Sequence, residues 1–168
     1  MTIRAVTRED VEHVVEIYNH YIQTTAITFE TEAVSLGEMT NRVEEIAAHY
    51  PWLVLEDNNT LVGYAYGSWY HKRPAYRFTV QTTIYLKPGM ARRGYGTQLY
   101  TELLLRLRAQ EYRTALGIIA LPNPASVRLH EKLGFQKVAH LTEVGWKFGR
   151  WIDTGYWQLP LERFATSA

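Results

Sequence analysis

The stretch that decides the fold covers residues 85–100 and reads YLKPGMARRGYGTQLY. The β-prone residues TTIYL lead into it and an amphipathic helix pattern leaves it, so its central glycines lie at a strand-to-helix junction. The start of a helix leaves backbone N–H groups without partners and carries partial positive charge, which favours a bound phosphate. Arg92 and Arg93 would add charge-assisted hydrogen bonds to such an anion. The junction is therefore a candidate anion site.

Two common phosphate-binding turns do not match this stretch. A Walker A turn needs Gly-Lys-Ser/Thr, but Gly94 is followed by Tyr95 and Gly96. A dinucleotide-binding turn needs a third glycine at the place of Leu99. A plain alternative stays open, in which the glycines only make a tight turn and the arginines are solvated.

Size and composition limit the classes of protein. The chain has 168 residues and no cysteine, so we expect a single domain over 1–168, without disulfides, a thiolate nucleophile or a cysteine-based zinc site. Its net charge is +1, from 18 basic and 17 acidic residues, which gives no overall field toward nucleic acid or anionic lipid. No apolar run approaches the roughly 20 residues of a membrane span, and Met1 leads directly into a polar segment. We expect a cytoplasmic protein.

The hydrophobic spacing predicts an alternation of helices and strands. Helices are expected at 7–22, 35–49, 94–111 and 123–134, and strands at 2–6, 52–56, 61–69, 77–86, 114–121, 135–144 and 154–161. Asn58 and Asn59 tolerate left-handed backbone angles and predict a tight hairpin between two of the strands. The fold class is therefore α/β, with one mixed central sheet and helices on both faces.

Beyond these patterns, ARRGYGTQL resembles the acyl-CoA pyrophosphate loop of the GCN5-related N-acetyltransferases (GNAT), Q/R-x-x-G-x-G/A, although Ala91 stands where the leading Gln or Arg is usual. Nearly the whole chain is similar to the phosphinothricin acetyltransferase branch, through YNHYIQTTAITFETE, YPWLVLE, YRFTVQTTIYL, LPNPASVRLHEKLGF and GYWQL. The resemblance implies a GNAT-type α+β fold with a single mixed, mostly antiparallel central sheet. It also implies transfer of acetyl from acetyl-CoA, without a metal, to the amino group of a small amino-acid-like acceptor such as phosphinothricin or methionine sulfoximine.

The resemblance assigns cofactor-binding residues to three places. Ile84, Tyr85 and Leu86 would pair their backbone with the pantetheine arm, as an added strand does. Asn123 and Ser126 would meet the far side of the cofactor, although either could be only a helix cap. The pyrophosphate would be cradled by Arg92, Arg93, Gly94, Tyr95, Gly96 and Thr97.

The catalytic residues are less clear from the sequence. Attack on a thioester needs a neutral amine, and related enzymes are thought to use a glutamate where this chain has Gln81, which cannot act as a base. Three routes for the proton stay open: His130 as the base, a water chain held by Gln81, or binding of the neutral amine. A backbone N–H near Tyr85 would stabilise the oxyanion, and Tyr85 or His130 would protonate the thiolate, although both could be structural.

The acceptor would lie against the loop WYHKRPAYRF and a residue of the first interhelical loop. Its carboxylate and phosphinate or sulfoximine groups suit basic side chains, although an exposed basic loop could be only solvated. The assigned residues are Phe29, Lys72, Arg73, Tyr76 and Arg77. Two alternatives remain: acetyl transfer to a different small amine or amino acid, and an acetyl-CoA-binding sensor with little catalysis. The aromatic segment GWKFGRW through GYWQLPL suits a core or a dimer surface, and we expect a homodimer.

Overall fold

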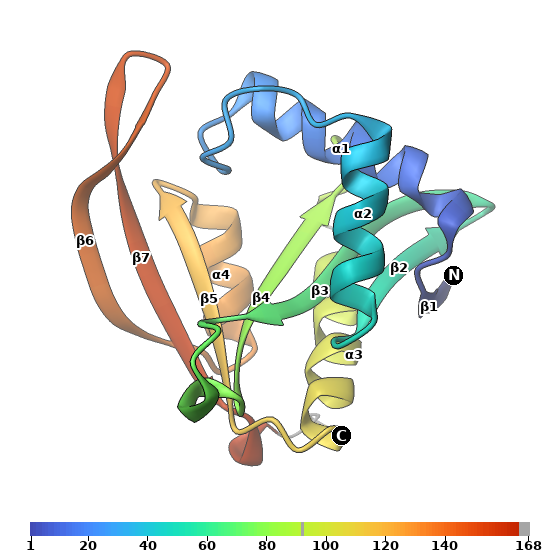
Figure 1. Ribbon diagram of the computed structural model, residues 1–168. Coiled ribbons are helices and arrows are strands. Elements are labelled where there is room, and N and C mark those ends of the chain that lie inside the picture. Colours follow the sequence, from blue (N-terminus) through green and yellow to red (C-terminus); the bar gives the residue numbers. More distant parts are fainter. Residues whose placement is uncertain (92, 165–168) are drawn as a thin grey trace.

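A computed structural model describes residues 1–91 and 93–164 (Figure 1). Within these residues the main elements are four α-helices and seven strands in one sheet. The helices are α1 (Val11–Thr24), α2 (Leu36–Ala47), α3 (Tyr95–Ala109) and α4 (Pro124–Lys132). The strands are β1 (Thr2–Ala5), β2 (Trp52–Asp57), β3 (Thr60–Trp69), β4 (Thr79–Leu86), β5 (Thr114–Leu121), β6 (Gln136–Lys147) and β7 (Arg150–Pro160).

The sheet has the order β1-β2-β3-β4-β5-β7-β6, and only β4 and β5 run parallel. This confirms a mixed, mostly antiparallel sheet. The two parallel strands pair from Thr79 opposite Thr114 to Thr82 opposite Gly117. Both strands continue beyond this point, to Leu86 and Leu121, but no longer pair with each other. They part like the arms of a V (Figure 1). We call the space between these arms the splay.

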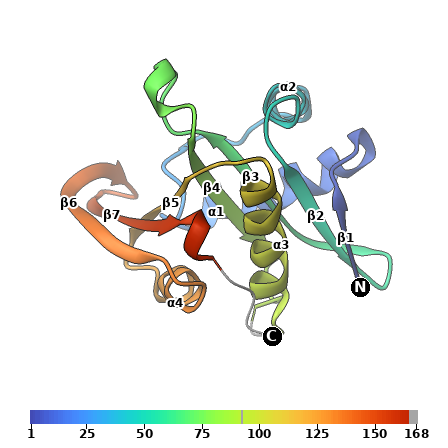
Figure 2. The ribbon, with the colours of Figure 1, turned by 90° about the horizontal axis from the view of Figure 1, so that it is seen from below.

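Helices cover both faces of the sheet, as predicted. Figure 2 shows α3 and α4 on one side, and α1 and α2 on the other. Strand alternation explains the two cores, because neighbouring residues of β2 point to opposite faces. Leu53 and Leu55 pack with the leucines of α3, whereas Trp52 and Val54 pack with the valines of α1.

Local sequence choices fix several turns. Asn58 and Asn59 take positive φ angles of 49° and 58° at the β2–β3 hairpin, as expected for this pair. Ser35 caps α2 by accepting a hydrogen bond from the Glu38 N–H at 3.2 Å. The residues described include no helix that is long and apolar enough to cross a membrane.

The last two strands are longer than the sequence predicted. The aromatic segment between them continues both strands into one hairpin, which turns at Phe148 and Gly149 with φ angles of 52° and 69°. The outward side chains of this hairpin are large and apolar, and Trp146 and Trp151 contact each other edge to face at 5.0 Å. In this segment Trp146, Phe148 and Trp151 face outward while Gly145 and Lys147 face inward, so the usual pattern of apolar residues inside and polar residues outside is absent from the sequence.

Candidate functional site

The arm of β4 presents main-chain groups to the splay. The Lys87 N–H donates to the Val62 carbonyl of β3 at 2.9 Å. In an antiparallel pair every second residue exchanges hydrogen bonds with the partner strand, and the residues between them direct their N–H and C=O groups away from it. Ile84 and Leu86 therefore turn their N–H and C=O groups toward the splay, while those of Tyr85 are taken by β3. Because β3 takes the backbone groups of Tyr85, the structure does not favour the prediction that Tyr85 pairs its own backbone with a ligand. The Leu86 carbonyl also accepts a hydrogen bond from the Tyr21 hydroxyl at 2.7 Å.

Helix α3 begins beside this arm. Its N-cap, Gly94, has a φ of 81°, which favours glycine, and no side chain of the described residues caps the first turn. The first helical bond runs from the Gln98 N–H to the Gly94 carbonyl, so the preceding N–H groups are directed out of the helix. A Cβ on Gly96 would lie 3.4 Å from Leu129, which shows how closely this turn meets α4. Arg92 lies outside the described residues.

Neighbouring side chains of this first turn are held by other elements. The Tyr95 hydroxyl donates to the Asp57 carboxylate at 2.5 Å, and the Lys132 ammonium lies 3.5 Å from the Thr97 hydroxyl. An anion at this turn would therefore meet backbone N–H groups more than side chains, apart from Arg93. This is a fit for a pyrophosphate.

His130 lies at the point where β4 and β5 part. Its ring is 4% exposed, and a Cβ on Gly117 would lie only 2.3 Å from its Nε2. Its Nδ1 lies 2.8 Å from the Ser126 carbonyl, so this nitrogen carries the proton and Nε2 accepts. The Tyr100 hydroxyl donates to Nε2 at 2.9 Å and lies 2.6 Å from the Thr82 hydroxyl.

This geometry does not suit the histidine to the role of base. Burial lowers the pKa of His130 to about 4, so the ring is neutral at pH 7 and accepts a proton poorly. Both ring nitrogens already have partners. The ring also lies on the α3 and α4 side of the sheet, whereas Gln81 points to the other face, because it neighbours Thr82 on β4.

The start of α4 orients this histidine. The Asn123 side chain accepts a hydrogen bond from the Ser126 N–H at 3.2 Å and so caps the helix. The Ser126 hydroxyl lies 3.4 Å from the His130 Nδ1. The cap reading of Asn123 is confirmed, and a further contact of either residue with a cofactor stays a prediction.

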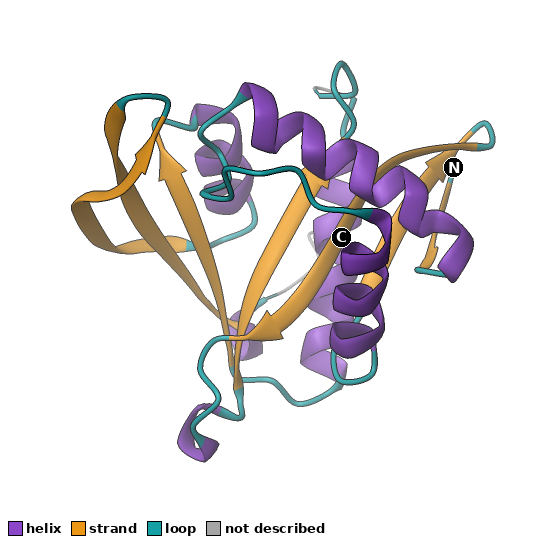
Figure 3. Ribbon diagram, turned by 45° about the horizontal axis from the view of Figure 1, so that its top comes forward, coloured by secondary structure: helices purple, strands orange, loops and turns teal. Residues whose placement is uncertain are grey.

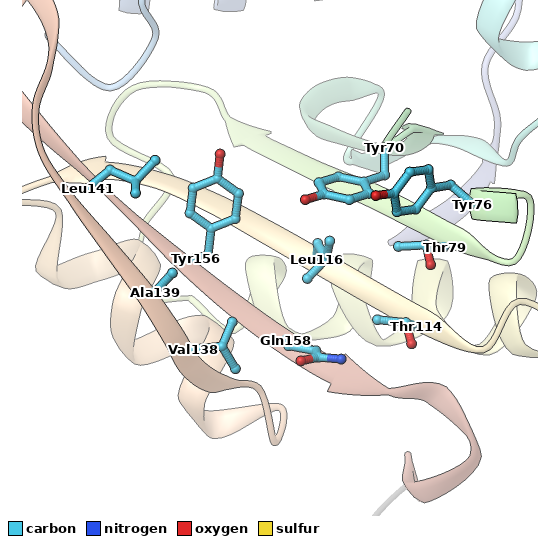
Figure 4. Close-up of a pocket in the computed structure, with 10 residues that line it drawn as sticks. All are labelled: Tyr70, Tyr76, Thr79, Thr114, Leu116, Val138, Ala139, Leu141, Tyr156 and Gln158. Carbon is cyan, nitrogen blue, oxygen red and sulfur yellow. The ribbon is translucent and has the colours of Figure 1, made fainter. Parts of the chain in front are cut away.

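The opposite face of the sheet has a cavity of about 430 Å³, and Gln81 is next to its lining residues without being one of them. Gln81 is paired with Leu116 and is two residues from Thr79, and both of these line the cavity. Figure 4 shows Tyr70 and Tyr76 projecting from the β3–β4 loop toward the same space as Tyr156 from β7. The full lining is Tyr70, Tyr76, Thr79, Thr114, Leu116, Val138, Ala139, Leu141, Tyr156 and Gln158. We call it the acceptor cavity.

The Tyr85 side chain lies away from this cavity, in an aromatic cluster. Its ring centroid is 5.4 Å from that of Tyr18, 5.1 Å from that of Tyr21 and 5.6 Å from that of Tyr64. Burial raises the pKa of Tyr85 well above its usual value, so the hydroxyl keeps its proton. The ring supports the packing of β4 against α1.

The basic loop separates into two parts. Lys72 and Arg73, with His71 and Tyr76, line a second cavity of about 440 Å³, and Tyr76 also lines the acceptor cavity. Arg77 instead lies over the Phe78 ring at 4.5 Å and is not among the lining residues of either cavity. The structure therefore brings Lys72, Arg73 and Tyr76 together, and leaves Arg77 apart.

Several residues of the site were missed from the sequence. Tyr100 is on the buried face of α3, where its hydroxyl needs a hydrogen-bond partner. A tyrosine among the leucines of this face is the sequence feature that could have indicated a buried polar network. Tyr156 and Gln158 alternate on β7 and so point to one face. No three His, Cys, Asp or Glu residues in the described ranges are grouped so that they could hold a metal ion.

Comparison with known proteins adds the family. Residues 3–155 match the acetyltransferase (GNAT) domain. The phosphinothricin N-acetyltransferase of Streptomyces viridochromogenes is 40% identical over 95% of this chain and 87% of its own, and the L-methionine sulfoximine/L-methionine sulfone acetyltransferase of Salmonella typhimurium is 35% identical over 98% and 97%. The crystal structure of a GNAT superfamily phosphinothricin acetyltransferase from Sinorhizobium meliloti, in complex with acetyl-CoA, superposes with a TM-score of 0.91 at 35% identity, covering 95% of this chain and 87% of that one. The chain therefore belongs to the GNAT family of acetyltransferases.

Proposed function

We propose that the chain transfers the acetyl group of acetyl-CoA to the amino group of a small amino-acid-like acceptor of the phosphinothricin or methionine sulfoximine type. One observation carries the proposal: the splay opens beside the uncapped start of α3 on one face and beside Gln81 and the acceptor cavity on the other. A thioester and an amine that enter from opposite faces would meet between β4 and β5. The activities named for the similar proteins agree with this arrangement.

The residues present fit the cofactor. The backbone N–H groups of the first turn of α3, together with Arg93, would hold the pyrophosphate. The Ile84 carbonyl and the Leu86 N–H, which β3 does not take, would pair with the pantetheine arm. Bound there, acetyl-CoA supplies the activated acetyl group, and the Ile84 N–H is the group that we assign to the oxyanion, worth about 3 to 4 kcal/mol if well aimed.

The acceptor cavity would hold the amine. Its aromatic side chains suit the carbon chain of an amino acid, and Lys72 and Arg73 of the adjoining cavity suit its acidic groups. Gln81 can hold a water or the ammonium through its amide but cannot take the proton. We infer that the amine loses its proton to water, or binds in its neutral form, since His130 is engaged on the other face.

Thiol release from acetyl-CoA, followed with a panel of amino acids, phosphinothricin and methionine sulfoximine, tests the proposal. We expect turnover with the last two and weaker turnover with ordinary amino acids. Calorimetry with acetyl-CoA runs in parallel. Binding without turnover on any acceptor would favour an acetyl-CoA sensor, and no binding would refute the cofactor site itself.

We also propose that the chain works as a cytoplasmic homodimer. The β6–β7 hairpin exposes Trp146, Phe148 and Trp151 at 56%, 59% and 58% of their surfaces, and aromatic side chains of this kind are enriched at interfaces. Sedimentation velocity of the purified chain would reveal a monomer if the proposal fails.

A further inference from the structure

The connection between α1 and α2, residues 25–35, crosses from the helices toward the β6–β7 hairpin (Figures 1 and 3). We call it the strap. On the helix side it is fixed through Glu30. Arg42 of α2 donates to both carboxylate oxygens of Glu30, at 2.6 and 3.2 Å, and the Tyr18 hydroxyl of α1 donates to one of them at 2.8 Å. The Tyr18 hydroxyl is also 3.0 Å from the Thr28 hydroxyl.

On the sheet side two contacts with β6 fix the strap. The Lys147 ammonium donates to the Thr28 carbonyl at 2.8 Å, across 119 positions of sequence. The Phe29 ring occupies the space above Gly145, where a Cβ would lie 2.5 Å from two ring carbons. The strap is thus held to the sheet at Thr28 and to the helices at Glu30, with Phe29 between these two residues.

These contacts place Phe29 at the end of the acceptor cavity. Leu141, which lines the cavity, is paired with Thr154 on β7, and Gly145 is paired with Ile152. Thr154 and Ile152 are two residues apart and share a face, so Gly145 lies on the cavity face just beyond Leu141. The Phe29 ring therefore continues the wall of the cavity toward the hairpin.

Lys147 is an unusual residue for this place. Only 4% of it is exposed, and a buried ammonium is costly unless it is hydrogen-bonded and near an opposite charge. Burial lowers the pKa of Lys147, and the Glu30 carboxylate acts against that shift. A methionine would fill a similar volume without this cost, so packing alone does not explain the lysine.

We propose that Lys147 is a positioning residue: by holding the Thr28 carbonyl it fixes Phe29 at the end of the acceptor cavity, and so sets the affinity for the acceptor without affecting acetyl-CoA binding. The inference rests on the proposed function for its acceptor. The claim that Lys147 fixes the strap does not depend on that function, because the contacts of Lys147 exist without a ligand.

The test compares Lys147→Met with Lys147→Arg and with Lys137→Met, which makes the same change at an exposed position of β6. For Lys147→Met we expect the acceptor KM to rise about tenfold, the effect of about 1.4 kcal/mol. We expect kcat and the Kd for acetyl-CoA to stay within about twofold, with partial recovery in Lys147→Arg and no change in Lys137→Met. Hydrogen exchange should speed up in residues 25–35 of Lys147→Met and not in β4.

A second variant covers a failure of Lys147→Met to fold. Gly145→Ala displaces Phe29 and keeps the lysine, so it should raise the acceptor KM in the same way. An unchanged acceptor KM in the folded Lys147 variant, or an equal rise in the Kd for acetyl-CoA, would overturn the inference. If the unmodified chain turns over no acceptor, the proposed function fails, and the exchange of the strap alone then decides the role of Lys147.

Discussion

Replacement of Gln81 by glutamate is the sharpest probe of the chemistry. Gln81 is half-buried on β4 beside Leu116, on the face of the acceptor cavity. The substitution keeps the shape of the side chain and supplies a group that can take a proton. If the amine of the acceptor loses its proton to water or binds in its neutral form in the unmodified chain, the new carboxylate should take that proton directly.

The size of the gain follows from the acceptor. An amine with a pKa of about 9 is neutral in about one molecule in a hundred at pH 7. A positioned base can recover at most that factor of about 100, or about 2.7 kcal/mol, which lies within the usual range for general base catalysis. We expect kcat/KM of Gln81→Glu to exceed that of the unmodified chain by about ten- to a hundredfold at pH 7, and the two to converge near pH 9.5.

The assay is thiol release from saturating acetyl-CoA over pH 5.5 to 9.5, with methionine sulfoximine as the acceptor. The profile of Gln81→Glu should gain an acidic limb that reports the new carboxyl group, whereas Gln136→Glu, an exposed change on β6, should leave the profile unchanged. A Gln81→Glu profile that follows the unmodified one, with neither a gain at pH 7 nor a new limb, would remove Gln81 from the path of the proton.

Four further outcomes are expected. The pKa of His130 is about 4 in the folded chain and about 6.5 in the unfolded chain, so the unfolded chain binds a proton first as the pH falls. The free energy of unfolding, measured by urea titration, should therefore fall by up to about 3 kcal/mol between pH 6.5 and 4. A His130→Gln variant whose stability falls equally with pH would contradict this. Gly117→Ala should cost about 1 to 3 kcal/mol by the same measurement, while Gly37→Ala, with nothing within 4 Å of the new Cβ, should stabilise α2 by about 0.5 to 1 kcal/mol; equal effects would argue against crowding at Gly117. Gly94→Ala strains a φ of 81° and should weaken acetyl-CoA binding by about tenfold in calorimetry, so unchanged heat would speak against the α3 site. Trp151→Glu should convert a dimer to a monomer in sedimentation velocity, and a persistent dimer would place the interface elsewhere.

Much of the fold could be predicted because local patterns and tertiary packing agree. The leucines of α3 repeat at helical spacing and enter one core, and Asn58 and Asn59 have the backbone freedom that their hairpin requires. The β6–β7 hairpin was predicted too short, since exposed aromatic residues hide the two-residue period. Sequence alone does not show what covers such a face.

Only those parts of the site that lie within one continuous segment of the chain could be predicted from the sequence. The glycines at the start of α3 predict a tight turn that leaves backbone N–H groups open, and the anion that we propose there is inferred from these groups. The partners of His130 are Tyr100 on α3 and Ser126 on α4, and Tyr100 in turn contacts Thr82 on β4, so this buried network depends on distances that spacing in the sequence cannot give. The hydrogen bond of Lys147 to Thr28 could not be predicted either, because it joins β6 to the loop after α1.

The place of β7 between β5 and β6 has a consequence for synthesis of the chain. Strand β5 pairs with β7 along all eight of its residues, and among the strands of residues 1–91 and 93–164 β6 has no neighbour other than β7. Until residue 160 has left the ribosome, the outer edge of β5 stays open and β6 has nothing to pair with. Newly made chains therefore carry an unprotected strand edge until β7 has emerged, and pairing of this edge with another chain is the hazard at that stage.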